Sequence, residues 1–175
     1  DYGSYHALVI GNDGYRHLKK LSTAVNDAEG IAEVLESDYG FEVDLLTNAT
    51  RDETLRAFSR LRKTVTPKDN LLIYYAGHGW LDKGMDEGFW LPVDATEDDP
   101  IEWVSNATVV GMVRAMKAKH VMVVADSCFS GTLVRGLKIK ERSPNYIQRM
   151  SKKKARTALT SGGLEPVTDV GGGNH

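Results

Sequence analysis

Short apolar runs alternate with segments of helical periodicity along most of the chain. This alternation is typical of β-α units that build a parallel sheet, so it predicts an α/β fold. Residues 70–75 (NLLIYY) and 120–125 (HVMVVA) are continuously apolar, as in strands that are covered on both faces. Further strands are predicted at residues 5–10, 41–46 and 156–160, with a short apolar piece at 89–93.

Three segments have the apolar spacing of amphipathic helices. The first precedes Gly40, a residue that suits the C-terminal end of a helix. The second begins at Thr50, which stands three residues before Glu53 as in a capping box. The third covers residues 106–118. Residues 77–88 are rich in glycine and acidic residues, and we expect them to form a loop.

Length and composition indicate one globular domain. The chain has 175 residues, of which 41% are hydrophobic, and it contains 22 basic and 24 acidic side chains. A single cysteine excludes a disulfide framework and any zinc site with several cysteines, and it favours a reducing compartment or a catalytic thiol. No apolar run approaches the roughly 18 residues of a membrane span. We therefore expect a cytoplasmic protein without a membrane partner.

The basic charge is concentrated in residues 135–156. This segment holds nine lysines and arginines and one acidic residue, Glu141, and it lacks sustained periodicity. It is predicted to be an exposed linker. A lysine- and arginine-rich segment can also bind nucleic acid, but the rest of the chain is acidic and no RNA-binding motif is present, so no nucleic-acid partner is expected.

The candidate chemistry follows the two buried runs, because open α/β sheets bind ligands beyond the carboxyl ends of their strands. The run 70–75 leads to His78, which has a glycine on either side, and the run 120–125 leads to Cys128. If the two strands are neighbours about 5 Å apart, the imidazole and the thiol face one crevice. A cysteine and a histidine so placed can form a nucleophile and its proton carrier.

Two other interpretations compete with catalysis. A single cysteine after a strand is most often an inert buried residue, but His78 precedes Cys128 by 50 residues, the spacing found in caspases. A nucleotide-binding module would carry a GxGxxG turn after the first strand, and none is present there. A non-catalytic ligand-binding or adaptor domain of the same fold remains the alternative.

The chain resembles the caspase-like cysteine peptidases, and within them the metacaspase and orthocaspase branch. The resemblance rests on five motifs: ALVIGN at 7–12, AVNDA at 24–28, YYAGHG at 74–79, LPVDA at 91–95 and DSCFSG at 126–131. It implies a three-layer sandwich with a mostly parallel central sheet and helices on both faces. It also implies that Cys128 is the nucleophile, that His78 transfers protons, and that the N–H groups of Gly79 and Cys128 hold the oxyanion.

The resemblance also bears on specificity. Caspases carry Gln two residues before the nucleophile, where this chain has Asp126, and the caspase arginine before the AVNDA-like motif is Leu21 here. A carboxylate at the pocket floor pairs with a cation, so we expect protein or peptide substrates that are cut after Arg or Lys. Weaker pocket candidates, each of which could be merely structural, are Asp27, Glu165 and Asp169.

The resemblance divides the single domain into three parts. Residues 1–134 match the large subunit, 135–156 form the basic linker, and 157–175 match the start of the small subunit. The family fold continues beyond residue 175, so we expect the remaining elements in cis or on another chain. An enzyme that cuts after Arg or Lys would also find cleavage sites in its own linker, which predicts self-processing.

The sequence itself requires no cofactor. Metacaspases often need calcium, and the acidic loop offers oxygen ligands that suit this ion. The weak calcium candidates are Asp82, Asp86 and Glu87, although the loop has no EF-hand pattern. A solvated acidic loop is the alternative interpretation.

Overall fold

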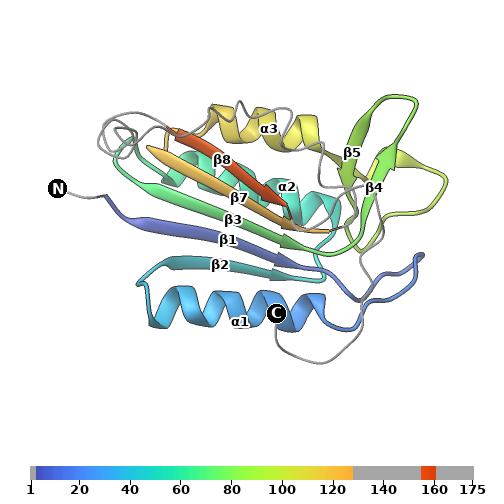
Figure 1. Ribbon diagram of the computed structural model, residues 1–175, viewed down its shortest axis with the longest axis horizontal. Coiled ribbons are helices and arrows are strands. Elements are labelled where there is room, and N and C mark those ends of the chain that lie inside the picture. Colours follow the sequence, from blue (N-terminus) through green and yellow to red (C-terminus); the bar gives the residue numbers. More distant parts are fainter. Residues whose placement is uncertain (1–2, 128–154, 161–175) are drawn as a thin grey trace.

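Five parallel strands form the central sheet in the described part of the chain, in the order β2-β1-β3-β7-β8 (Figure 1). The computed structural model describes residues 3–127 and 155–160. The five strands predicted for this sheet are confirmed, and their ends differ from the prediction by at most one residue. Their bounds are Tyr5–Gly11 for β1, Glu42–Thr47 for β2, Asn70–Ala76 for β3, His120–Asp126 for β7 and Ala155–Thr160 for β8.

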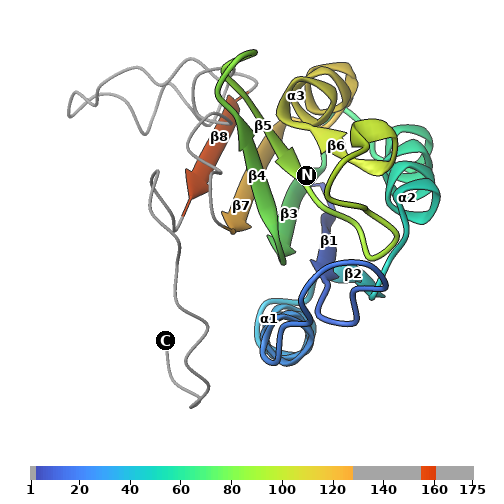
Figure 2. The same cartoon turned by 90° about the vertical axis from the view of Figure 1, so that its right-hand side faces the viewer.

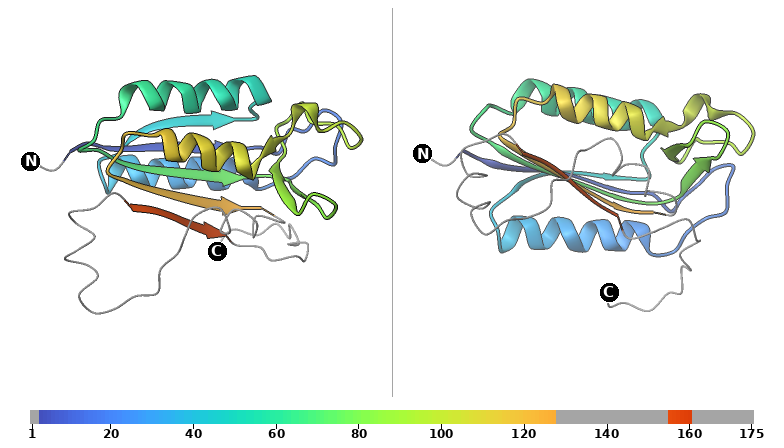
Figure 3. Two further views of the ribbon diagram at one scale, coloured as in Figure 1. Left: turned by 90° about the horizontal axis from the view of Figure 1, so that it is seen from above. Right: turned by 45° about the horizontal axis from the view of Figure 1, so that its top comes forward.

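Helices cover both faces of this sheet. Helix α1 (Ala24–Ser37) lies on one face, whereas α2 (Arg51–Thr64) and α3 (Asn106–Ala115) lie on the other (Figures 1 and 3). This arrangement is the predicted three-layer α/β sandwich. The central strand β3 is buried on both sides, since Ile73 and Tyr75 pack toward α2 and α3 while Tyr74 packs toward α1.

The capping box predicted from the sequence is confirmed at the start of α2. The Thr50 hydroxyl accepts the Glu53 backbone N–H at 3.3 Å, and the Thr50 backbone N–H donates to the Glu53 carboxylate at 2.8 Å. The two bonds satisfy groups that the first turn of a helix leaves unpaired. Gly40, expected near the end of α1, has a positive φ of 67°, which glycine adopts at little cost.

Helix α3 ends three residues earlier than the sequence pattern predicts. Met116 has an extended conformation with ψ of 138°, which breaks the helix, yet its side chain is buried. The apolar pattern therefore continues past Ala115 because the chain still packs on the core after it has left the helix.

The prediction of a loop at residues 77–88 is wrong. This segment contains β4 (Gly79–Asp82) and the start of β5 (Glu87–Trp90), which pair as an antiparallel hairpin with β6 (Val104–Ser105) alongside. The hairpin forms because Phe89 and Trp90 bury their rings on opposite faces of β5. It stands at the carboxyl end of the central strands, where the 3-10 turn η1 (Pro100–Glu102) also lies (Figure 2).

The proposed division into large-subunit, linker and small-subunit parts depends on residues outside the described ranges, and it stays a prediction. Among the residues that the structure does describe, no helix is long and apolar enough to cross a membrane.

Candidate active site

Strands β3 and β7 are direct neighbours, as the candidate site requires. They pair in parallel, and their register places Ala76 opposite Asp126. His78 stands two residues after Ala76, and Cys128 stands two residues after Asp126. The two motifs thus leave adjacent strands at the same level. Cys128 itself lies outside the described residues.

Two tyrosine hydroxyls hold the backbone of His78. The Tyr15 hydroxyl accepts the His78 backbone N–H at 2.7 Å, and the Tyr75 hydroxyl donates to the His78 carbonyl at 2.7 Å. Tyr15 in turn donates to the Leu91 carbonyl at 2.9 Å. Tyr15 and Tyr75 are both almost fully buried, so these bonds fix His78 in a dry, rigid frame.

Both hydroxyls stay protonated at neutral pH. Burial of the ring is the main reason that the pKa of Tyr15 lies above its ordinary value, and burial likewise raises the pKa of Tyr75. A neutral hydroxyl can donate one hydrogen bond and accept others, which is what the contacts to His78 and Leu91 need.

The imidazole of His78 is oriented by the loop that follows β1. Its Nε2 atom lies 2.7 Å from the Lys19 carbonyl oxygen, which can only accept a hydrogen bond. The ring also lies against the Tyr15 ring, with 4.5 Å between centroids and an angle of 45°. Because Nε2 carries the proton in this contact, the neutral imidazole has its lone pair on Nδ1.

Gly77 allows the two tyrosines to come this close. A Cβ atom at this position would lie 2.7 Å from the Tyr15 hydroxyl oxygen and 2.8 Å from that of Tyr75. Any other residue would push these hydroxyls away from His78. The glycine before the histidine is therefore required by the packing around it.

Two of the predicted pocket carboxylates lie on the α1 side of the sheet and act on the same residue, Tyr74. Asp126 ends β7 on the face where Val124 packs toward α1, and Asp27 lies in the first turn of α1. Burial raises the pKa of Tyr74 above its ordinary value, and the negative charges of Asp126 and Asp27 raise it further. The two carboxylates thus act on the same buried phenol.

The other specificity residues have different positions. Leu21 is partly buried against both the α1-side core and the cluster around Tyr15 and Phe89, so an apolar residue occupies this place. Glu165 and Asp169 lie outside the described residues.

Two of the acidic residues suggested for calcium, Asp82 and Glu87, accept hydrogen bonds from the backbone. Asp82 accepts the N–H groups of Gly84 and Met85 at 2.8 and 3.0 Å, and Glu87 accepts the N–H of Ala107 at 2.7 Å, at the start of α3. No group of three or more His, Cys, Asp or Glu side chains suited to a metal ion occurs among the described residues. The assignment of Asp82, Asp86 and Glu87 to calcium stays a prediction.

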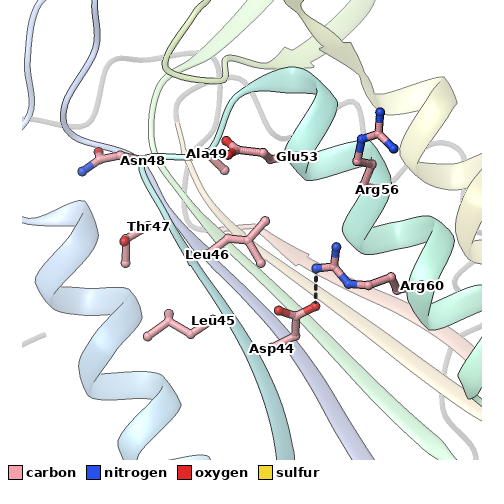
Figure 4. Close-up of a pocket in the computed structure, with 9 residues that line it drawn as sticks. All are labelled: Asp44, Leu45, Leu46, Thr47, Asn48, Ala49, Glu53, Arg56 and Arg60. Atoms are coloured by element: carbon pink, nitrogen blue, oxygen red, sulfur yellow. Dashed lines mark hydrogen bonds and ion pairs between the residues drawn. The ribbon is translucent and has the colours of Figure 1, made fainter.

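A separate hollow of about 440 Å³ lies at the outer edge of the sheet, between β2 and α2 (Figure 4). Its two arginines are both paired, Arg60 with Asp44 of the lining at 2.8 Å and Arg56 with Asp52, outside the lining, at 2.6 Å. None of the candidate residues that the structure describes, His78, Gly79, Asp126 and Asp27, lines it. The chemistry is therefore expected at the carboxyl ends of β3 and β7.

Comparison with known proteins agrees with this geometry. A family model described as "Caspase domain" matches residues 4–166. The chain belongs to the caspase domain family. This is a family of cysteine peptidases, and the matched residues include β3 and β7, which precede His78 and Cys128 in the sequence.

The relatives of this caspase domain include fungal metacaspases. It is 29% identical over 152 residues to Metacaspase-1 of Saccharomyces cerevisiae, an alignment that covers 75% of this chain and 34% of the yeast protein. It is also 29% identical to Metacaspase-1 of Meyerozyma guilliermondii, over 74% of this chain and 36% of that protein. The chain thus spans about a third of the length of these relatives.

A solved structure shares the fold of this caspase domain. Protein GSU0716 from Geobacter sulfurreducens superposes with a TM-score of 0.64 at 21% identity, over 90% of this chain and 72% of that one. At this identity the likeness concerns the fold alone.

Proposed function

We propose that this caspase domain is a cysteine endopeptidase that cleaves proteins after Arg or Lys, with Cys128 as nucleophile and His78 as its acid and base. The parallel register of β3 and β7 carries the proposal. Neighbouring strands lie about 5 Å apart, and both residues follow the paired Ala76 and Asp126 by two positions. This favours a thiol and an imidazole that share one crevice.

The orientation of His78 supports its role as a base. Because Nε2 donates to the Lys19 carbonyl at 2.7 Å, the lone pair of Nδ1 is left to accept a proton from the thiol. The Lys19 carbonyl also stabilises the imidazolium that forms. In this site the group that orients the imidazole is a backbone carbonyl oxygen, so no carboxylate is needed for that role.

The reaction then has two halves. In the first, the Cys128 proton passes to His78, the sulfur attacks the carbonyl carbon of the substrate, and the C–N bond breaks as His78 returns the proton to the leaving amine. In the second, water gives one proton to His78, and its oxygen attacks the thioester. The C–S bond breaks, the acid product leaves, and the proton returns to the sulfur.

Gly79 is suited to stabilise the oxyanion. The His78 carbonyl accepts the Leu91 N–H at 3.0 Å, and Gly79 pairs with Trp90 at the next position of the same antiparallel ladder. Hydrogen-bonded and non-bonded pairs alternate in such a ladder, so the Gly79 N–H points away from β5. A donor that is fixed in this way costs no reorganisation in the transition state.

Asp126 and Asp27 would provide the preference for a basic P1 side chain. Their carboxylates act together on Tyr74, and Asp126 stands two residues before Cys128 in the sequence. Two negative charges on one side of the nucleophile attract a guanidinium or ammonium and repel an aspartate. Leu21, an apolar side chain, offers nothing to hold an acidic P1 residue.

The same preference makes the basic linker a substrate of the enzyme. Residues 135–156 contain nine basic side chains between the cysteine motif and β8, and Arg149 and Lys152 to Lys154 are the expected P1 positions. Self-processing here would separate the part that ends after Cys128 from the part that carries β8.

The test compares fluorogenic peptides that end in Arg, Lys or Asp. The wild-type protein should cleave the Arg and Lys peptides at least about tenfold faster than the Asp peptide, because the carboxylates reject a like charge. Cys128→Ala should abolish cleavage, and His78→Ala should remove most of it. Equal or faster cleavage after Asp would overturn the pocket assignment, and undiminished turnover in Cys128→Ala would overturn the peptidase proposal.

Self-processing is tested on the same proteins by mass spectrometry of fragments. Wild-type protein should be cut within residues 135–156, while Cys128→Ala should remain intact there. An active wild-type protein that stays uncut in this segment would overturn self-processing, as would equal cutting of the Cys128→Ala protein.

A further inference from the structure

One face of the β4–β5 hairpin carries His78 together with a row of apolar side chains. The ladder pairs Trp80 with Phe89, and the Leu91 N–H bond to the His78 carbonyl extends it by one step. Since side chains alternate along a strand, His78, Trp80, Phe89 and Leu91 share a face. Phe89 and Leu91 pack with Tyr15 on this face, whereas Trp90 packs into the main core on the other.

The row ends in an aromatic surface that remains open to solvent. The Trp80 ring is 48% exposed and lies 6.0 Å from the Trp103 ring, which lies 5.4 Å from Phe89 in an edge-on arrangement. Trp103 is held in place because its indole N–H donates to the Thr96 carbonyl at 2.8 Å. Trp103 is therefore fixed before binding, so it would lose little conformational entropy when a ligand packs on the surface.

The proposed reaction indicates which part of a substrate lies beside this surface. His78 must deliver its proton to the amine nitrogen of the leaving half, so the first residues after the scissile bond lie on the His78 side. The carboxylates that attract the P1 side chain lie near Tyr74, on the α1 face. Trp80, two residues after His78 on the same hairpin face, would then lie beside the leaving half.

We propose that Trp80, supported by Trp103, binds a large apolar or aromatic side chain in the first two residues after the scissile bond, and so adds a leaving-side specificity to this peptidase. The inference rests on the proposed function. Burial of a half-exposed indole against an apolar side chain gives the binding energy, and the ring can stack on Phe, Tyr or Trp. Rigid aromatic anchors of this kind often dominate peptide binding.

The test uses internally quenched peptides with one Arg at P1 and either Phe, Leu or Gly at the two following positions. Wild-type protein should cleave the Phe and Leu peptides with kcat/KM at least about tenfold above that of the Gly peptide. Trp80→Ala should remove this difference while it still cleaves the Gly peptide at the wild-type rate. Trp80→Phe should restore most of the preference, which separates side-chain recognition from damage to the hairpin.

Matched controls come from two other exposed apolar residues near this end of the molecule. Met85, at the hairpin turn, and Ile101, in η1, are 62% and 67% exposed, and their change to alanine should leave the preference intact. A preference that survives in Trp80→Ala, or its absence from an active wild-type protein, would overturn the inference. Failure to cleave any peptide with Arg or Lys at P1 would instead overturn the proposed function.

Discussion

The hydroxyl of Tyr15 accepts the backbone N–H of His78 at 2.7 Å, across 63 positions of the sequence. This contact joins the loop after β1 to the turn after β3, and the same loop orients the imidazole through the Lys19 carbonyl. The position of the histidine therefore depends on a buried phenol far away in the chain.

Tyr15→Phe should lower both stability and catalysis. The change removes the acceptor of the His78 N–H and the donor to Leu91, and a buried unpaired group of this kind costs about 1–3 kcal/mol. If half of this loss falls on the transition state, kcat decreases by about two- to tenfold. Kinetics on an Arg peptide, with thermal melting in parallel, measures both effects. Tyr39→Phe, at a 67% exposed position, is the matched control, and an unchanged kcat in Tyr15→Phe would contradict this role.

Gly77→Ala should disturb the same frame. The added Cβ would meet the Tyr15 and Tyr75 hydroxyls at 2.7 and 2.8 Å, so one of them must move, at a cost of about 1–3 kcal/mol. We expect a lower melting temperature and a loss of peptide cleavage. In Gly30→Ala on α1, where nothing lies within 4 Å, the same change should stabilise the helix by about 0.5–1 kcal/mol. A Gly77→Ala protein as stable and active as wild type would show that the contact is not tight.

Asp126→Asn should weaken the preference for a basic P1 residue. Loss of one charged hydrogen-bond partner costs about 1.4 kcal/mol or more, which corresponds to about a tenfold decrease in kcat/KM on Arg peptides. Asp27→Asn should also decrease kcat/KM on Arg peptides, but by less, because Asp27 is exposed. Asp38→Asn, just after the other end of α1, should change nothing. Wild-type discrimination between Arg and Asp peptides in Asp126→Asn would contradict the pocket assignment.

Asp69 is predicted to stabilise the fold in a pH-dependent manner. Burial alone would raise its pKa, but hydrogen bonds from Thr66 and Ser4, with His6 nearby, hold the pKa below its ordinary value. A lowered folded-state pKa stabilises the protein above the unfolded value of about 3.9, and this contribution is lost as pH falls through the folded pKa.

Asp69→Asn should therefore decrease the free energy of unfolding by about 1–3 kcal/mol at pH 7, and the difference from wild type should shrink below about pH 4. Urea denaturation at pH 7 and pH 3.5 measures this. Asp52→Asn, whose side chain is 71% exposed, should show a much smaller effect. A difference that is the same at both pH values would rule out the charge of Asp69 as its cause.

The sheet and its helices could be predicted from the sequence because their signals are local. Apolar runs, helical spacing and the Thr50–Glu53 capping box each depend on residues within one element. The pairing of β3 with β7 could not be predicted, because periodicity does not reveal which strands are neighbours. The sequence supports a shared crevice only on the condition that these two strands pair. The hairpin at residues 79–90 was missed because its turn is rich in glycine and acidic residues, and its stability comes from Phe89 and Trp90.

The residues that orient His78 could not be predicted from local patterns. Tyr15 reaches it from a distant loop, and its buried hydroxyl gives no sign of this role in the sequence. The Lys19 contact uses a backbone carbonyl, which every residue type possesses, so no residue type signals it. The candidate pair itself was visible because glycines, strand ends and the spacing of 50 residues coincide.

Covalent labelling of Cys128 tests the central claim most directly. A peptide that carries an electrophilic ketone after Arg should modify Cys128 once per chain, and mass spectrometry of fragments identifies the site. The matched peptide with Asp in place of Arg should label far more slowly, and His78→Ala should slow labelling by the Arg peptide. Labelling of Cys128 no faster than that of a free thiol, and unaffected by His78→Ala or by the P1 residue, would contradict the account.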